Sequence, residues 1–77
     1  MISVGERIKR LRKAKRLTQQ ALAEKTGLTN TYICDIEKGR TNPSLKSLER
    51  ISEALEVSPS FLISCDYENN VNIAGAG

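Results

Sequence analysis

The chain has 77 residues, 39% of them hydrophobic and 27% charged, with a formal net charge of +3, as in one small globular domain. Histidine is absent, which excludes Ser-His-Asp hydrolysis, Cys-His catalysis and histidine-ligated metal sites. No apolar run approaches the ~20 residues that span a bilayer, and the start lacks a secretory signal, so we expect a cytoplasmic protein with no membrane contact, metal or cofactor.

The first predicted helix, over about residues 5–15, carries six of the twelve Lys/Arg residues. Residues 1–40 hold ten Lys/Arg and four Asp/Glu, net +6, whereas residues 41–77 hold two Lys/Arg and five Asp/Glu, net −3. Seven of the basic residues form a basic run: Arg7, Lys9, Arg10, Arg12, Lys13, Lys15 and Arg16. This run indicates a polyanionic partner, with a solvated helix face as the alternative. No aromatic residue is interleaved, so base stacking on single strands is not indicated.

Four further short helices are predicted from hydrophobic spacing and capping residues. Thr18 and Thr29 can cap two of them with their hydroxyl groups. Gly27 and Gly39 can end the same two helices, because glycine adopts a left-handed backbone at little cost. The four helices are expected over about residues 19–25, 30–38, 45–56 and 59–64. Strand signals are nearly absent, so the predicted fold class is all-α.

Apolar side chains in the last two helices predict part of the core and a surface for a partner. The amphipathic stripe of the fourth helix that is expected to face the core consists of Leu45, Leu48, Ile51 and Leu55. In the fifth helix Phe61, Leu62 and Ile63 are consecutive, and a helix cannot turn all three inward. We expect Leu62 and Ile63 to be left for a second copy of the chain. The alternative is that the tail folds back over them.

The composition changes near the C-terminal end of the chain. From Asp66 onward Asn, Gly and Ala dominate, which indicates a flexible tail over residues 66–77 and one domain over residues 1–65. Cys34 and Cys65 are too few for a disulfide framework or a four-cysteine zinc site. We therefore expect both to be free thiols in a reducing cytosol.

The segment from residue 19 to residue 38 has the spacing of a helix-turn-helix motif. Gly27 would make the turn, and the small side chain of Ala23 would let the two helices cross closely. The side chains expected to fill the wedge between the helices are Leu22, Leu28, Ile33 and Ile36. In this motif the second helix enters the DNA major groove.

Six sequence pieces around these spacings resemble the Cro/repressor-type (Xre) helix-turn-helix domains of phage repressors and restriction–modification controller proteins. The pieces are Arg7–Arg12 (RIKRLR), Leu17–Ala23 (LTQQALA), Gly27–Leu28, Ile36–Arg40 (IEKGR), Asn42–Leu45 (NPSL) and Ala54–Pro59 (ALEVSP). The resemblance covers about residues 4–64 and implies a compact five-helix, lambda-repressor-like domain. It implies a regulator, a repressor in our interpretation, that binds a palindromic double-stranded operator as a homodimer. The two subfamilies stay open, and Thr26 departs from the family, which usually has an apolar residue there.

Helical spacing predicts which side chains read the bases. If Ile33 and Ile36 face inward, the residues on the outer face are Asn30, Thr31, Cys34, Asp35 and Lys38. The amide of Asn30 can pair with adenine, and Thr31 can contact a base edge or a thymine methyl. Cys34 can meet a thymine methyl. Asp35 must accept from cytosine or pair with a cation, because phosphates repel it. The alternative is an ordinary solvated helix surface.

Other residues are predicted to contact the DNA backbone or to support the fold. In the family the glutamine at the start of the second helix clamps a phosphate, and the loop after the third helix follows the backbone. The predicted backbone contacts are Gln19, Thr29, Tyr32, Lys38, Arg40 and Asn42. For Tyr32 a half-buried packing role is the alternative. The resemblance also implies an ion pair between Arg12 and Glu37 that supports the fold.

Two other functional classes compete with DNA binding. An antitoxin-like or protein-interaction module could use the same fold, and an exposed apolar stripe would favour it. An enzyme is not expected, because Asp35 and Glu37 lie on different faces of their helix and the sequence contains no phosphate loop or nucleophile–base pair.

Overall fold

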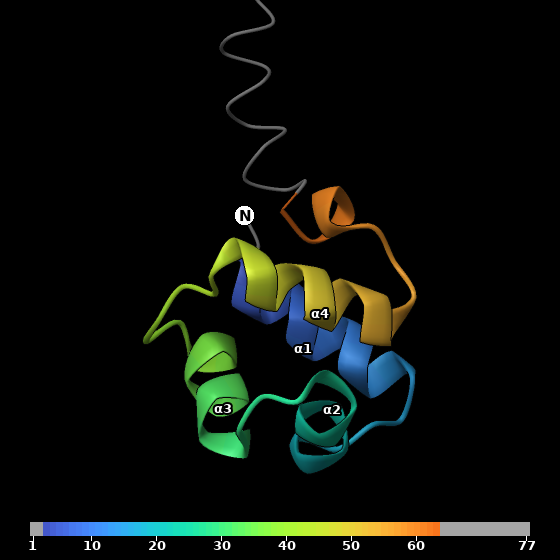
Figure 1. Cartoon of the computed structure of the whole chain (residues 1–77), viewed down its shortest axis with the longest axis vertical. Coiled ribbons are helices and arrows are strands. Elements are labelled where there is room, and N and C mark those ends of the chain that lie inside the picture. Colours follow the sequence, from blue (N-terminus) through green and yellow to red (C-terminus); the bar gives the residue numbers. More distant parts are fainter. Residues whose placement is uncertain (1–2, 64–77) are drawn as a thin grey trace, which may run out of the picture.

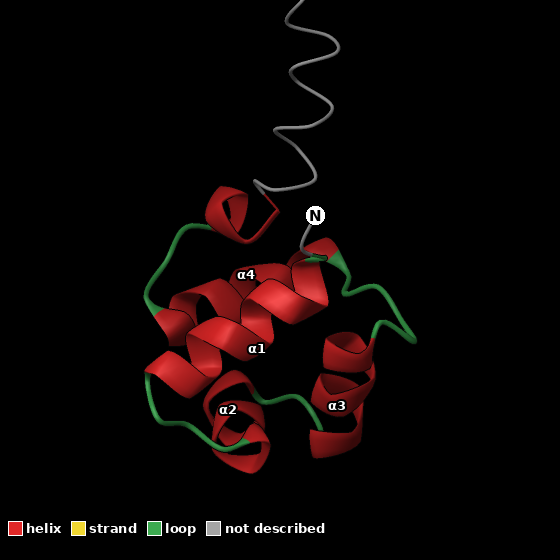
Figure 2. Cartoon of the chain, turned by 180° about the vertical axis from the view of Figure 1, so that it is seen from behind, coloured by secondary structure: helices red, strands yellow, loops and turns green. Residues whose placement is uncertain are grey.

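The computed structural model describes residues 3–63, and the expected tail over residues 66–77 and the thiol of Cys65 lie outside them. The helices are α1 (Val4–Ala14), α2 (Gln19–Thr26), α3 (Asn30–Lys38) and α4 (Leu45–Leu55), followed by a short fifth helix over residues 59–63. All the regular structure in the described part is helical (Figure 2). The all-α prediction is confirmed, and the predicted helix bounds agree with the observed ones within about a residue.

The helices pack in two crossed pairs around a single core. Figure 1 shows α1 and α4 running side by side, with α2 and α3 below them and the fifth helix above. α3 packs on α1 and α2, and α4 packs on the same two helices. The fully buried apolar side chains are Ile8, Leu22, Ile33, Ile36, Ile51, Leu55 and Leu62. Each helix, the fifth included, therefore contributes to one core.

Hydroxyl side chains begin the helices and glycines end two of them. The predicted caps Thr18 and Thr29 accept the N–H groups of Ala21 and Tyr32, each at 3.0 Å. Ser3 and Ser44 do the same for α1 and α4. The caps that end α2 and α3 are Gly27 and Gly39, with φ of 74° and 79°. The capping predicted from the sequence is confirmed.

α1 approaches the end of α3 so closely that only glycine fits at the contact. Gly5 is buried, and a Cβ atom placed on it would overlap the backbone carbonyl of Ile36. Gly5 therefore fixes the distance between α1 and the helix predicted to read DNA.

Two predictions about apolar residues are wrong. Leu45 was expected to face the core, but it is 70% exposed, because it lies in the first turn of α4, beyond the part of the stripe that packs. Leu62 was expected to remain free for a partner, but it is 1% exposed and belongs to the core. Phe61, at 42% exposed, is instead the apolar side chain that the fifth helix leaves on the surface.

Candidate nucleic-acid interface

A tight turn sets the angle between α2 and α3. Gly27 supplies the left-handed residue, and its successor Leu28 donates its N–H to the carbonyl of Ala23 at 3.1 Å. Thr26, the departure from the family pattern, is buried, and its hydroxyl donates to the carbonyl of Leu22 at 2.8 Å. The polar group is therefore satisfied within the turn, and Thr26 is compatible with the motif.

The outer face of α3 consists of Asn30, Thr31, Cys34, Asp35 and Lys38, as predicted from helical spacing. Asn30, Thr31 and Lys38 are exposed, and Cys34 and Asp35 are half-buried. The opposite side of the helix, with Ile33, Ile36 and Glu37, is buried. The structure thus brings the predicted base-reading residues together on one surface.

A buried ion pair connects α1 to α3. The guanidinium of Arg12 donates from Nε and Nη2 to the two carboxylate oxygens of Glu37, at 2.7 and 3.0 Å. The side chains are 9% and 2% exposed. The remaining Nη1 donates to the carbonyl of Leu17 at 2.7 Å, which ties down the loop before α2. Arg12 and Glu37 therefore fix both helices of the motif against α1.

Gln19 belongs to the same network. It opens α2, is half-buried, and its Nε2 donates to Oε1 of Glu37 at 3.1 Å. Its Nε2 carries a second hydrogen that can be donated to a further partner, and the first N–H groups of α2 lie next to it. This is the geometry of an anion site at a helix start, where we predicted a phosphate contact.

The loop that follows α3 presents the other predicted backbone contacts. Arg40 and Asn42 are exposed, and Thr29, at the other end of α3, is exposed beside its capping bond. The guanidinium of Arg40 lies 3.9 Å from the carboxylate of Asp35, and the two side chains are 69% and 35% exposed. Such an exposed pair is weak, so both groups remain free to rearrange.

Tyr32 points away from the outer face and toward the start of α4. Its hydroxyl donates to the hydroxyl of Ser47 at 3.2 Å and accepts the backbone N–H of Ser44 at 3.3 Å. The bonds with Ser47 and Ser44 lower the pKa of Tyr32 below its ordinary value of 10.0. The ring packs against the core. These three residues are called the hydroxyl cluster below.

Four members of the basic run contact other side chains of the domain. Arg12 is in the buried pair, Arg10 pairs with Glu6 at 3.2 Å, and Lys15 pairs with Glu56 at 2.8 Å. The guanidinium of Arg7 stacks over the ring of Phe61 in the fifth helix, with its carbon atom 5.0 Å from the ring centre. Neither an ion pair nor a ring contact is found among the described residues for Lys9, Lys13 and Arg16. Of the three ion pairs, that of Arg12 is buried, whereas those of Arg10 and Lys15 are exposed and therefore weak.

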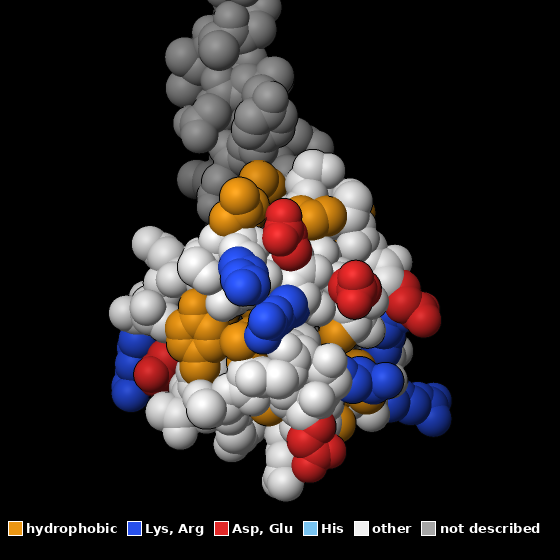
Figure 3. Space-filling model, viewed as in Figure 1, with side chains coloured by type: hydrophobic (Ala, Val, Ile, Leu, Met, Phe, Trp, Pro, Cys, Tyr) orange, Lys and Arg blue, Asp and Glu red, His pale blue; other side chains and the backbone are white. Residues whose placement is uncertain are grey.

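One face of the molecule carries charged groups of both signs. On the face seen in Figure 3, lysine and arginine side chains lie at both edges and in the middle, with acidic side chains among them. On this face, binding of a polyanion would depend on where the basic groups lie as well as on net charge.

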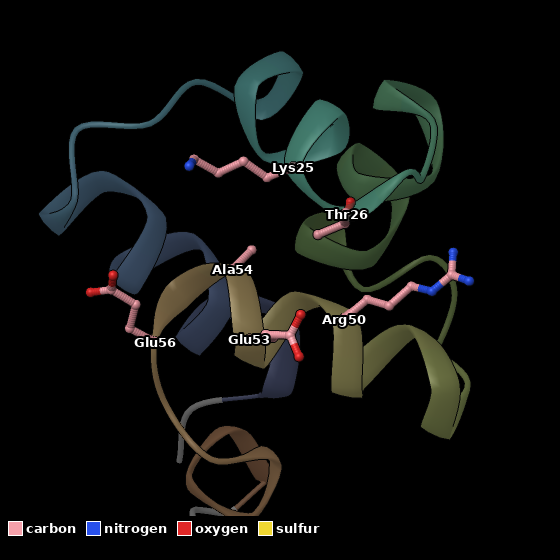
Figure 4. Close-up of a pocket in the computed structure, with 6 residues that line it drawn as sticks. All are labelled: Lys25, Thr26, Arg50, Glu53, Ala54 and Glu56. Carbon is pink, nitrogen blue, oxygen red and sulfur yellow. The ribbon is translucent and has the colours of Figure 1, made fainter.

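One hollow of the described part is lined mainly by charged and polar side chains. It has a volume of about 430 Å³ and lies between α2 and α4, lined by Lys25, Thr26, Arg50, Glu53, Ala54 and Glu56. Figure 4 shows the charged ends of Lys25 and Arg50 pointing toward opposite ends of it. Within residues 3–63 no cluster of three metal-ligating side chains is found, and no helix there could cross a membrane. The candidate site is the outer face of α3, where the predicted base-reading residues lie together.

The fifth helix presents one exposed aromatic. Phe61 is 42% exposed and lies under the guanidinium of Arg7, whose carbon atom is 5.0 Å from the ring centre. Ile63 is half-buried against the core. With Leu62 buried, the surface that the fifth helix leaves for a partner is smaller than the sequence predicted and is centred on Phe61.

Three residues of structural importance to the site were not identified from the sequence. Gly5 carries no motif signal, although a glycine in the first turn of a helix is a reason to look for a close backbone approach. Ser44 and Ser47 at the start of α4 bind Tyr32 across the loop. Their spacing of three residues predicts a cap but does not predict the tyrosine that joins them.

Comparison with known proteins gives a consistent result. A family model described as helix-turn-helix matches residues 8–62. The immunity repressor protein of Bacillus phage phi105 is 47% identical over 62 residues, which cover 80% of this chain and 43% of the repressor. The chain thus spans less than half the length of this relative.

Solved structures also match most of the chain. The P22 c2 repressor in complex with synthetic operator 9T, from a phage of Salmonella, has a TM-score of 0.77 and 35% identity, over 80% of this chain and 94% of that one. The restriction–modification controller protein C.AhdI of Aeromonas hydrophila has a TM-score of 0.75 and 37% identity, over 77% and 89% of the two chains. Both subfamilies considered from the sequence are therefore represented.

Proposed function

Because this chain belongs to the helix-turn-helix family, we propose that it is a sequence-specific regulator of transcription that binds double-stranded DNA with α3 in the major groove. The resemblance to Cro/repressor-type domains stated from the sequence is confirmed by the match. The observation that carries the proposal is the outer face of α3, where polar side chains surround the exposed Asn30 and Thr31 and the opposite side is buried.

The polar groups of the outer face suit contact with base edges. The amide of Asn30 can donate to and accept from adenine in the major groove, and Thr31 offers a hydroxyl and a methyl. Cys34 is half-buried and presents a small side chain to a thymine methyl. Asp35 reads cytosine when it leaves its loose pair with Arg40.

Groups on both sides of α3 hold the DNA backbone. Gln19 and Thr29 lie at the starts of α2 and α3, where N–H groups favour a phosphate. Lys38, Arg40 and Asn42 follow at the other end of α3 and are exposed. Contacts of this kind set the register of α3 in the groove without reading sequence.

We propose that the chain acts as a homodimer and represses transcription in a bacterial cytosol. A single small domain contacts few base pairs, and two domains read half-sites roughly 34–36 Å apart on a palindrome. Phe61, 42% exposed, and Ile63 at its edge supply the apolar surface for the second copy. Repression is proposed because the relatives from phi105 and P22 are named repressors.

Selection of bound duplexes from a random DNA pool, at two salt concentrations, tests the proposal. The expected result is a palindromic consensus with half-sites about one helical turn apart. Recovery of no consensus, with binding that falls steeply as salt rises, would leave only a nonspecific charge effect. A protein-interaction module, the competing interpretation, would then be the one to pursue.

A further inference from the structure

The loop between α3 and α4 is tied back to α3 by a tyrosine hydroxyl. Residues 39–44 are called the connecting loop, and they carry Arg40 and Asn42, which are proposed phosphate contacts. At its first end the loop is held by the N–H groups of Gly39 and Arg40, which donate to the carbonyls of Ile36 and Asp35. At its far end Tyr32 accepts the N–H of Ser44, twelve residues along the chain.

Hydrogen bonds among the three residues of the hydroxyl cluster hold this far end of the loop. Tyr32 donates its single hydroxyl proton to Ser47, and the hydroxyl of Ser44 donates to the same oxygen at 3.0 Å. Ser44 in turn accepts the N–H of Ser47 at 3.1 Å, which is the cap of α4. Ser47 is 7% exposed, so water does not readily replace the bonds made to its hydroxyl, whereas the bond from the N–H of Ser44 to Tyr32 is exposed.

The aromatic ring and the hydroxyl of Tyr32 have separable roles. The ring packs on the core, together with the apolar side chains that surround α3. The hydrogen bonds of the hydroxyl within the described residues go to Ser44 and Ser47. Removal of the hydroxyl alone therefore leaves the packing intact and releases the loop.

We propose that Tyr32 is a positioning residue, which holds the connecting loop at a fixed place relative to α3 so that the phosphate contacts and the base contacts are made together. The inference rests on the proposed DNA-binding function. It replaces the direct DNA contact expected for Tyr32 with a role through the loop. An ordered loop binds with a smaller loss of conformational entropy, so the hydroxyl raises affinity for every sequence alike.

The test compares Tyr32→Phe, Ser47→Ala and the double variant with the wild-type chain. Ser60→Ala, an exposed serine of the fifth helix, is the matched control. The first readout is the backbone amide dynamics of Thr41 and Asn42 by nuclear magnetic resonance in the free protein. Both single variants are expected to lower the order parameters there, with the melting temperature little changed.

The second readout is affinity for the selected operator. Each single variant is expected to weaken binding about three- to tenfold, the range that corresponds to one net hydrogen bond, with base preference and salt slope unchanged. The double variant is expected to be no weaker than Tyr32→Phe alone. Ser47 orients the Tyr32 hydroxyl that accepts the N–H of Ser44, and Tyr32→Phe removes that hydroxyl altogether.

Two results would overturn the inference. If Tyr32→Phe weakens binding while Ser47→Ala does not, and the loop amides stay rigid, the hydroxyl touches DNA directly. If neither variant changes loop order or affinity, the cluster is ordinary packing. Because the amide measurement uses free protein, it decides the claim about the loop even if no operator is recovered, an outcome that would overturn the proposed function instead.

Discussion

Arg12 on α1 and Glu37 on α3 form a two-bonded ion pair that is almost fully removed from water, with bonds of 2.7 and 3.0 Å. Arg12→Ala is expected to lower the free energy of unfolding by about 3–5 kcal/mol, because it leaves a buried carboxylate uncompensated. Arg10→Ala, which breaks an exposed pair, is the control and should cost less than about 1 kcal/mol. Thermal unfolding measures both. An equal, small effect of the two changes would contradict the structural role of Arg12.

The contact between Gly5 and the backbone of Ile36 predicts an effect of Gly→Ala on stability that is opposite to the usual one in a helix. In an ordinary helix Gly→Ala stabilises by about 0.5–1 kcal/mol. Here the added methyl overlaps a backbone carbonyl, so Gly5→Ala should destabilise by about 1–3 kcal/mol. Denaturant unfolding measures the change, with Lys13→Ala on the exposed side of α1 as control. A stabilised Gly5→Ala variant would show that α1 does not approach α3 this closely.

The loop between α1 and α2 contains a strained residue. Arg16 has φ of 59°, a left-handed conformation that costs a non-glycine residue about 1–2 kcal/mol. Arg16→Gly should therefore raise stability by about 1 kcal/mol. Arg16→Ala removes the same charge but keeps the strain, and it should give no such gain. Melting temperatures of the two variants separate the backbone effect from the charge effect, and equal values would contradict it.

The ion pair between Lys15 and Glu56 predicts that stability depends slightly on pH in the acidic range. The hydrogen bond from Lys15, then the charge of Lys15, lower the pKa of Glu56 below its ordinary 4.5. A carboxylate whose pKa is lower in the folded state than in the unfolded state stabilises the fold. This stabilisation is present above the pKa of the unfolded state and is lost as pH falls through the pKa of the folded state. The wild-type chain should therefore be more stable than Glu56→Gln above pH 4.5, and this difference in stability should shrink below pH 4.5. The stability of Glu53→Gln should change with pH as that of wild type does. A constant difference across this range would contradict the pair.

The local features of this fold were predictable from sequence, and the contacts between distant residues were not. Caps such as Thr29 and the turn at Gly27 depend on the backbone chemistry of a few neighbouring residues, and both were confirmed. The pairing of Arg12 with Glu37 was implied by family resemblance rather than by spacing, and the structure contains it.

Periodicity failed where a helix extends past its neighbours or turns an unexpected side inward. It placed Leu45 in the core, although the first turn of α4 lies beyond the packed part of the stripe. It left Leu62 for a partner, because three consecutive apolar residues do not show which one faces inward. The tie between Tyr32 and Ser44 depends on how α3 and α4 cross, which no pattern within either helix encodes.

The central claim is that the outer face of α3 reads bases while its flanks hold phosphates. The most direct measurement compares Asn30→Ala and Lys38→Ala on the selected operator and its single-base-pair variants over a series of salt concentrations. Asn30→Ala should lose discrimination at one base pair, by about 1–3 kcal/mol. Lys38→Ala should weaken all sequences alike and reduce the salt slope by about one. Identical behaviour of the two variants would contradict the separation of base reading from phosphate contact.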